Sequence, residues 1–496
     1  MRCVPVIFIF LLFSLQSFAG YNFDANCKAA YQAAWKLEPA EVNNYISLEK
    51  AQNPSNHLVY YLESLDQFLV VFSCEEKPAF QEFKNDMDNR LEALYQDGNG
   101  PWYLYSRAEI YLQSAVLKLK FSDYLAAAYD FNKAYNNLTD CCNKYPEFLP
   151  AQKDLLLLKA MVGCVPGNYR WMLKILGFSG DLKTSVSKYG ILVSKMDKSK
   201  DYALFARESR IIYAYLNYFM MNRPDEAWKQ MDMATKDYLS NPVDAFVRAN
   251  IAMRVKKNDI AIETLSAFAT SPPPIPYLDY MMGVAKLQRG DGNAGFYLGR
   301  YLKEYKGQHY IKDAWLKLGW AFLLVGDTKH YQSAMELVPV SGTAQLEEDK
   351  NAQKEAAASK YLVPGILRAR LYFDGGYLDK ANAEIQKVDL GILTSDRQKF
   401  EYYYRYARIL DGMGNDKQAL KFYQLVIDKY GSATDANQSG NTYFDPASCL
   451  FAGMIMEKEG DFDKARVFYQ KCLSYKNYGY KDSFDQKAYA GLKRIQ

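Results

Sequence analysis

Apolar residues recur along this chain at the spacing of a helix, and short turns rich in Gly, Asp and Asn separate one such stretch from the next. Tyr202, Phe205, Ile212, Leu216 and Phe219 fall on one face of an expected helix, because residues three or four apart point to the same side. A glycine after a helix can adopt the left-handed conformation that ends it. Turns of this kind are expected at residues 290–293, 326–327, 374–376, 414–416 and 460–461.

One frame of small and large residues repeats in the last third of the chain. In its clearest copy, small Gly453 and Ala465 let two antiparallel helices approach, and Met456 and Tyr469 fill the space between them. A single pair of helices cannot bury its apolar face alone, so such pairs must stack on one another. Two earlier copies of the frame are Tyr403, Ala407, Leu410, Gly414, Ala419, Tyr423 and Val426, and Ala369, Tyr372, Gly376, Ala381, Ile385 and Val388.

This frame resembles the tetratricopeptide repeat family. The resemblance implies an all-α fold in which helix–turn–helix repeats form a tetratricopeptide-like α-α superhelix. We expect the repeat array over residues 191–496, after an irregular helical N-terminal region over residues 20–190. The distances between successive frame alanines exceed the about 34 residues of a strict repeat, so insertions are expected. One segment between repeats, residues 346–360, is charged and Ala-rich and is expected to be an exposed helix.

A second, shorter resemblance lies in residues 163–185. Pro166, Leu173 and the run Gly177–Asp181 are similar to a segment of the tetratricopeptide repeat protein 39 and inclusion-body-clearance family. That resemblance implies a non-enzymatic helical repeat protein, in a family linked to protein aggregates and to lipid droplets or membranes. The chain departs from the family at Leu182, where a basic residue is typical, and in carrying an export signal.

Residues 1–19 have the pattern of a secretory signal peptide. Arg2 supplies the positive charge, Val4 to Phe13 is apolar, and Ser17-Phe18-Ala19 is a small-x-small cleavage site. The apolar run is shorter than the about 20 residues of a spanning helix; the alternative is an N-terminal membrane anchor. We expect an exported protein, periplasmic or outer-membrane-associated if the host is bacterial, with no transmembrane span and with peripheral membrane association compatible with the pattern.

The overall charge is close to balance. The chain has 61 Lys and Arg against 57 Asp and Glu, a formal charge of +4 over 496 residues. A nucleic-acid-binding surface usually shows as an excess of positive charge, so we expect a protein or peptide partner and no nucleic acid.

Residues that carry out catalysis or bind metals are sparse. His57, His309 and His330 are the three histidines, and they lie far apart in the sequence. The chain has eight cysteines, and an odd number of them remains when Cys3 is removed with the signal peptide. The adjacent pair Cys141-Cys142 has no further ligand at the spacing of a metal site. We expect buried thiols, no metal, no cofactor and no enzyme activity.

Two glycine-rich stretches match catalytic or nucleotide-binding motifs only in form. Gly290 to Gly295 fits a dinucleotide fingerprint, but a helical stretch precedes it where that motif needs a strand. Gly177-Phe178-Ser179-Gly180 fails the spacing of a nucleophile elbow. We interpret both as turns, with Ser179 capping the next helix.

Aromatic residues make up 15% of the chain, and most of them are expected in the repeat cores. Within Tyr402-Tyr403-Tyr404 the frame assigns only Tyr403 to the core, so at least one neighbour should be exposed. In the tetratricopeptide family the first helix of each pair lines the concave surface. By that resemblance, the frame places Trp320, Arg370, Tyr404 and Arg408 in a partner-binding groove, and Arg and aromatic side chains are usual interface anchors.

These observations favour an exported, non-enzymatic helical repeat scaffold that binds another protein or peptide in its concave groove. The alternative is a glycan- or nutrient-binding component at a bacterial cell surface, which export and the abundance of tyrosine permit. A third hypothesis is a hydrolase whose catalytic residues the sequence does not reveal.

Overall fold

The computed structural model describes residues 20–95, 100–163, 178–270, 272–430 and 442–496, and within these ranges it contains helices, turns and no strand. This confirms the expected all-α fold. The signal peptide expected over residues 1–19 lies outside the described residues. No described helix is long and apolar enough to cross a bilayer.

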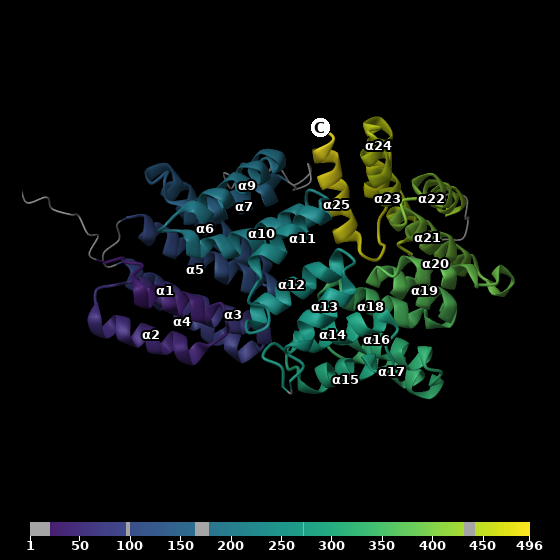
Figure 1. The fold of residues 1–496 in the computed structure, drawn as a ribbon, viewed down its shortest axis with the longest axis horizontal. Coiled ribbons are helices and arrows are strands. Elements are labelled where there is room, and N and C mark those ends of the chain that lie inside the picture. Colours follow the sequence, from purple (N-terminus) through teal and green to yellow (C-terminus); the bar gives the residue numbers. More distant parts are fainter. Residues whose placement is uncertain (1–19, 96–99, 164–177, 271, 431–441) are drawn as a thin grey trace, which may run out of the picture.

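The helices follow one another with short connections (Figure 1). The first part of the chain forms α1 (Ala25–Ala34), α2 (Pro39–Gln52), α3 (Leu58–Cys74), α4 (Lys77–Tyr95), α5 (Pro101–Lys120), α6 (Tyr124–Lys144), α7 (Leu149–Gly163) and α9 (Leu182–Lys198). The middle part forms η2 (Ala203–Phe205), α10 (Ala206–Phe219), α11 (Pro224–Ala234), α12 (Pro242–Arg254), α13 (Asn258–Ser266), α14 (Tyr277–Arg289), α15 (Ala294–Glu304), α16 (Ile311–Leu324) and α17 (Thr328–Val340). The last part forms α18 (Glu347–Ala357), η3 (Ser359–Tyr361), α19 (Pro364–Gly375), α20 (Leu378–Gln386), η4 (Leu390–Ile392), α21 (Asp396–Gly412), α22 (Asp416–Tyr430), α23 (Phe444–Glu459), α24 (Phe462–Ser474) and α25 (Lys481–Arg494).

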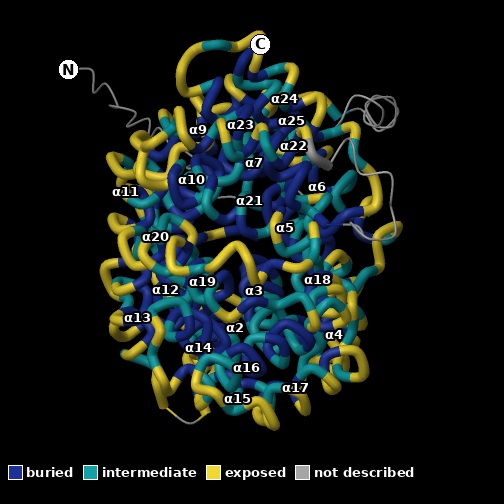
Figure 2. Tube along the Cα trace, turned by 90° about the vertical axis from the view of Figure 1, so that its right-hand side faces the viewer, coloured by how far each residue is buried: buried dark blue, intermediate teal, exposed yellow. Residues whose placement is uncertain are grey.

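Helices pack mainly as consecutive pairs from α10 onward. Seven helices, α10, α12, α14, α16, α19, α21 and α23, each pack against the next helix in the chain (α11, α13, α15, α17, α20, α22 and α24); we call them first helices and their partners second helices. The pairs lie side by side and the chain curves through them (Figure 1). This arrangement confirms helix–turn–helix repeats in an α-α superhelix. Buried residues run through the interior and exposed ones lie toward the outside (Figure 2).

The small residues of the frame lie where two helices touch. A Cβ added at Gly453 of α23 would come within 2.8 Å of the Tyr469 ring of α24, and Ala465 and Tyr469 are fully buried. Gly460 ends α23 with φ of 81°, a left-handed conformation that costs glycine little. The glycines at 290, 326, 376 and 414 end or follow their first helices in the same way.

The expectation for Tyr402-Tyr403-Tyr404 was wrong. Tyr402 and Tyr404 are 8% and 4% exposed, whereas Tyr403 is only partly buried. Tyr402 packs against the preceding pair and Tyr404 against Phe444 of the following pair. A first helix is therefore covered by both neighbouring pairs as well as by its own second helix, and more of its surface is buried than the frame assigns.

Helix α18 is not the exposed helix that its composition suggested. Its residues Asp349, Ala352 and Ala356 are buried against α16 and α17. The Asp349 carboxylate accepts backbone N–H groups of Tyr310 (2.7 Å) and Asp313 (3.1 Å) at the start of α16. These contacts satisfy donors that a helix start leaves unpaired, and they outweigh the polar character of α18.

The segment similar to the inclusion-body-clearance family lies mostly outside the described residues, including Pro166 and Leu173. Its described end corrects one prediction: Asp181, not Ser179, caps α9 by accepting the Thr184 N–H at 2.8 Å. A Cβ at Gly180 would come within 2.0 Å of the Lys159 carbonyl oxygen, so this position requires glycine.

The N-terminal half packs continuously against the array. Glu208 of α10 accepts hydrogen bonds from Tyr31 of α1 and Lys153 of α7, and all three side chains are buried. The boundary expected between residues 190 and 191 falls inside α9; the division into two regions stays a prediction. The six described cysteines beyond the leader are free thiols.

At the other end, the last helix returns toward the middle of the chain. Arg494 of α25 donates to both carboxylate oxygens of Glu457 and to the Met220 carbonyl oxygen at the end of α10. Figure 1 shows α25 beside α10 and α11. The array therefore curls until its C-terminal end meets its beginning.

Matched glycine substitutions test this packing. We expect Gly453→Ala to lower the free energy of unfolding by about 1–3 kcal/mol, because the new methyl group overlaps the Tyr469 ring. Gly299 lies within α15 with nothing within 4 Å of an added Cβ, so Gly299→Ala should be neutral or stabilising by up to about 1 kcal/mol. Urea unfolding followed by circular dichroism measures both. Equal effects of the two substitutions would contradict the close approach of α23 and α24.

Candidate functional site

The four predicted groove residues come from first helices, as expected, but they differ in accessibility. Trp320 of α16 and Tyr404 of α21 are only 3% and 4% exposed. The side chains of Arg370 of α19 and Arg408 of α21 keep 12% and 19% of their surface exposed. Only the two arginines therefore offer polar atoms to the inner space, and a binding role for all four residues stays a prediction.

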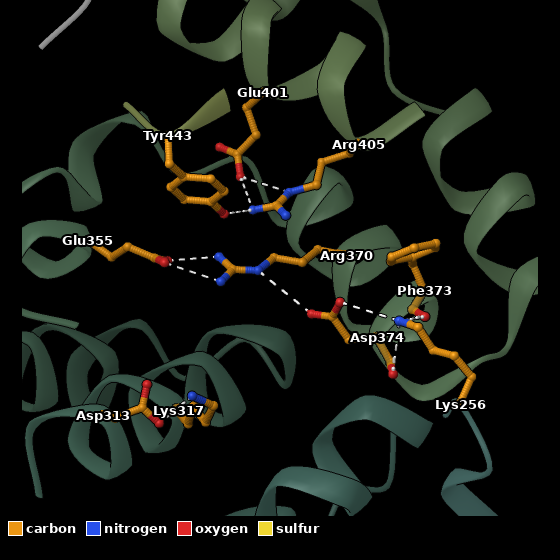
Figure 3. A network of polar contacts seen from close by, with 10 residues as sticks. All are labelled: Lys256, Asp313, Lys317, Glu355, Arg370, Phe373, Asp374, Glu401, Arg405 and Tyr443. Carbon is orange, nitrogen blue, oxygen red and sulfur yellow. Dashed lines mark hydrogen bonds and ion pairs between the residues drawn. The ribbon is translucent and has the colours of Figure 1, made fainter. Parts of the chain in front are cut away.

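Arg370 is already engaged by the protein. Its guanidinium donates to both carboxylate oxygens of Glu355 of α18, at 2.8 and 3.1 Å (Figure 3). It also lies 4.8 Å from the centre of the Trp320 ring. Burial opposes the charge of Arg370, but Glu355, with smaller contributions from Tyr443 and Tyr480, raises the pKa of Arg370 well above its usual value. Together with Trp320, this bidentate pair ties α18 and α16 to α19.

Arg405 stands beside this pair and was missed by the sequence frame. It donates to the Tyr443 hydroxyl at 2.6 Å and to Glu401 at 3.2 Å (Figure 3). The hollow that contains Arg370 and Arg405 has a volume of about 40 Å³. This is enough for a few water molecules at most. This part of the inner wall is therefore nearly filled by its own side chains.

Lys256 joins two distant turns of the superhelix. It lies after α12 at the place where other first helices end in glycine, with φ of 65°, a conformation that costs a residue with a Cβ about 1 kcal/mol or more. Its ammonium group donates to the Phe373 carbonyl oxygen at 2.7 Å and lies 3.8 Å from the Asp374 carboxylate, both on α19. Burial lowers the pKa of Lys256 to about 8, even with Asp374 nearby.

A larger hollow opens next to Lys256. It has a volume of about 320 Å³, the size of pockets that take a few side chains or a small ligand. Arg408 reaches its edge from α21, where it donates to Asp411 at 3.0 Å and lies 3.4 Å from the Phe451 ring centre. Other lining residues are Tyr218, Asn250, Met253, Arg254, Tyr277, Tyr280, Met281, Tyr310, Glu348 and Asp374. We call this space the inner cavity.

The structure thus separates the predicted residues into two groups. Trp320 and Arg370 border the filled hollow, whereas Arg408 borders the inner cavity. The sequence frame missed Arg254 and Lys256 because the α12–α13 turn has no glycine. A lysine in the frame's glycine position was the signal that could have identified this turn.

One group of described residues has the types and spacing that a metal ion requires. Ligand atoms of Asp24, Cys27 and Glu49 lie within 4.8 Å of one another. Glu49 already accepts hydrogen bonds from the side-chain amides of Asn26, Asn53 and Asn56, and Asp24 caps α1. The protein itself therefore satisfies these carboxylates without a metal ion.

No family model and no curated protein matches this chain. Among solved structures, the chain is similar to a monomeric mutant of IFIT1 with m7Gppp-AAAA, the cap being in the anti conformation. The two are 13% identical, the match covers 83% of this chain and 99% of that chain, and the TM-score is 0.27. We base no argument about shape or ligand on a similarity of this degree.

One expectation about partners was wrong. We expected no nucleic-acid partner from the near-balanced total charge alone, and total charge cannot support that exclusion. The physical error is that total charge does not report how charge is distributed. Here several cations gather on the inner surface although the chain as a whole is nearly balanced.

A double-mutant cycle tests the pair that closes the filled hollow. We expect Glu355→Leu alone to destabilise the fold more than Glu355→Leu combined with Arg370→Met, because the single change leaves a largely buried guanidinium unpaired. The coupling energy should be about 1–3 kcal/mol, measured by urea unfolding. The exposed pair Lys464–Asp461 provides the control cycle, whose coupling should be much smaller because water screens both charges. Equal coupling in both cycles would contradict the enclosed geometry.

Proposed function

We propose that this protein is an exported, non-enzymatic helical repeat scaffold that holds a segment of another protein against its concave surface. The observation that carries the proposal is the inner cavity, where cations and tyrosines from α10, α12, α14 and α21 line one open space. Arginine and tyrosine are the residues that most often anchor protein interfaces. A cavity of this size suits a short segment with several side chains.

Two features of the sequence support the rest of the proposal. The leader pattern over residues 1–19 supports export, and the periplasm is the compartment proposed for a bacterial host. The similarity of residues 163–185 to the inclusion-body-clearance family supports a non-enzymatic role. Neither feature identifies the partner.

The arrangement of the tyrosines favours a protein segment over a glycan. Tyr277 stacks on Tyr280 with ring centres 4.9 Å apart, and Tyr310 lies 4.7 Å from Tyr277 and 5.1 Å from Tyr280. Tyr277 and Tyr280 cover one face of each other, and the tilted Tyr310 ring crowds both, whereas sugar binding uses open aromatic faces. Their edges and hydroxyl groups are better suited to backbone and side-chain contacts.

Site-specific photocrosslinking in the native host tests the proposal. A photoreactive phenylalanine analogue replaces Tyr218, which lines the inner cavity from α10, or, as a control, Val467, which is 63% exposed on the second helix α24. We expect a discrete adduct from position 218 and none from position 467.

The chemistry of the adduct decides between partner classes. A protease-sensitive, nuclease-resistant adduct from position 218 supports the proposal. Equal adducts from both positions would place the interface elsewhere, a nuclease-sensitive adduct would indicate a nucleic acid, and a glycosidase-sensitive one would indicate a glycan. Each of these three results contradicts the proposed function.

A further inference from the structure

Two cations have no acidic partner among the residues that the structure describes. Arg254 lines the inner cavity, and Lys487 lies beside it, within reach of the charges of Arg254 and Arg408. Arg254 donates only to the neutral Asn250, at 3.0 Å, and lies over the Phe219 ring. Lys487 of α25 makes no hydrogen bond or ion pair with any described residue, yet it is partly buried. Most other inner cations are paired, as Arg408 is with Asp411.

The unpaired cations face one another across the array. The charges that act most strongly on Lys487 are Arg408 of α21 and Arg254 of α12, and both oppose its protonation; Glu347 of α18 acts in the other direction and less strongly. The Glu347 carboxylate is itself held by the Asp482 N–H at 2.8 Å. Burial and the two arginines lower the pKa of Lys487 to about 8.

For Lys487 this convergence is costly in the free protein, because like charges repel and its partial burial removes water that would screen them. Three helices distant in the sequence, α12, α21 and α25, bring these side chains together. The cost is offset when a ligand supplies negative charge between them. Charged side chains that lack a partner of opposite charge are common in binding sites.

We propose that the inner cavity binds an acidic segment of the partner protein, with Asp or Glu side chains seated between Arg254, Lys487 and Arg408 and an apolar side chain against Met253 and Met281. This inference rests on the proposed scaffold function and specifies the chemistry of the bound segment.

The acidic residues of the cavity favour a peptide over a nucleic acid. Asp374 and Glu348 line the same space, and they repel a continuous phosphate backbone more than carboxylates that a peptide can space to avoid them. Met253, Met281 and Val284 add apolar surface, which an acidic segment with interspersed apolar residues can bury.

Fluorescence anisotropy with defined peptides tests this chemistry. The probe is a short labelled peptide of alternating Glu and Leu; its Gln–Leu counterpart and a labelled single-stranded oligouridylate are comparisons. We expect the Glu–Leu peptide to bind about tenfold or more tightly than the Gln–Leu peptide, and its affinity to fall with added salt.

Charge-reversal variants test which cations bind the peptide. Arg254→Glu and Lys487→Glu should each weaken the Glu–Leu peptide about tenfold or more, whereas Lys303→Glu, the same change at an 82% exposed side chain outside the cavity, should leave binding unchanged. Arg254→Gln serves where circular dichroism shows that Arg254→Glu does not fold. Equal binding of the Glu–Leu and Gln–Leu peptides, no binding of either, or tighter binding of oligouridylate that these variants abolish would overturn the proposal.

The pH dependence of peptide binding distinguishes a direct role of Lys487 from a structural one. Raising the pH from about 7 to 9 removes the proton from Lys487 and from Lys256, whose pKa values lie near 8, so affinity for the Glu–Leu peptide should fall. Lys487→Arg keeps its charge at pH 9 and should retain more affinity there than the wild type. Identical pH profiles would contradict a direct role for Lys487.

Different results would reject the scaffold function and the acidic bound segment. A protein adduct at position 218 together with no preference for the Glu–Leu peptide would leave the scaffold function standing and reject the acidic segment. Absence of any adduct would reject the scaffold function first.

Discussion

Each first helix in this array is enclosed by its own second helix and by the pairs before and after it, and the rest of the structure depends on that enclosure. A helical pair cannot bury its apolar surface alone, so stability comes from stacking. Only a narrow strip of each first helix then faces inward. Charged residues on that strip, such as Arg370, Arg405 and Arg408, are held by neighbouring side chains and cannot turn away into solvent.

The superhelix is tightened by polar contacts between turns distant in the sequence. Lys256 keeps a left-handed backbone and a partly buried charge to reach Phe373 and Asp374. Helix α18 fills the neighbouring space and caps α16 through Asp349. These contacts divide the inner space into a filled hollow and an open inner cavity, and the cations that lack partners lie at the open one.

The fold could be predicted from the sequence where the packing contacts join residues close together in the chain. Gly453 and Tyr469 are sixteen residues apart, and their contact is a property of one helical pair. The residues of the site could be predicted only in part, because their positions depend on how far the superhelix curls. The frame indicated which helices face inward, but Tyr404 is buried by the next pair, and Lys487, from the far end of the chain, lies near the arginines of the cavity. Such contacts leave no periodic signal.

Hydrogen–deuterium exchange of the full-length protein, with and without the purified partner recovered by crosslinking, tests the central claim most directly. The concave surface is the proposed binding site, so protection on binding should concentrate in the first helices α12, α14 and α21 and in α25, and should spare second helices such as α15 and α24. Protection confined to second helices, or to the N-terminal helices α1 to α6, would contradict this account.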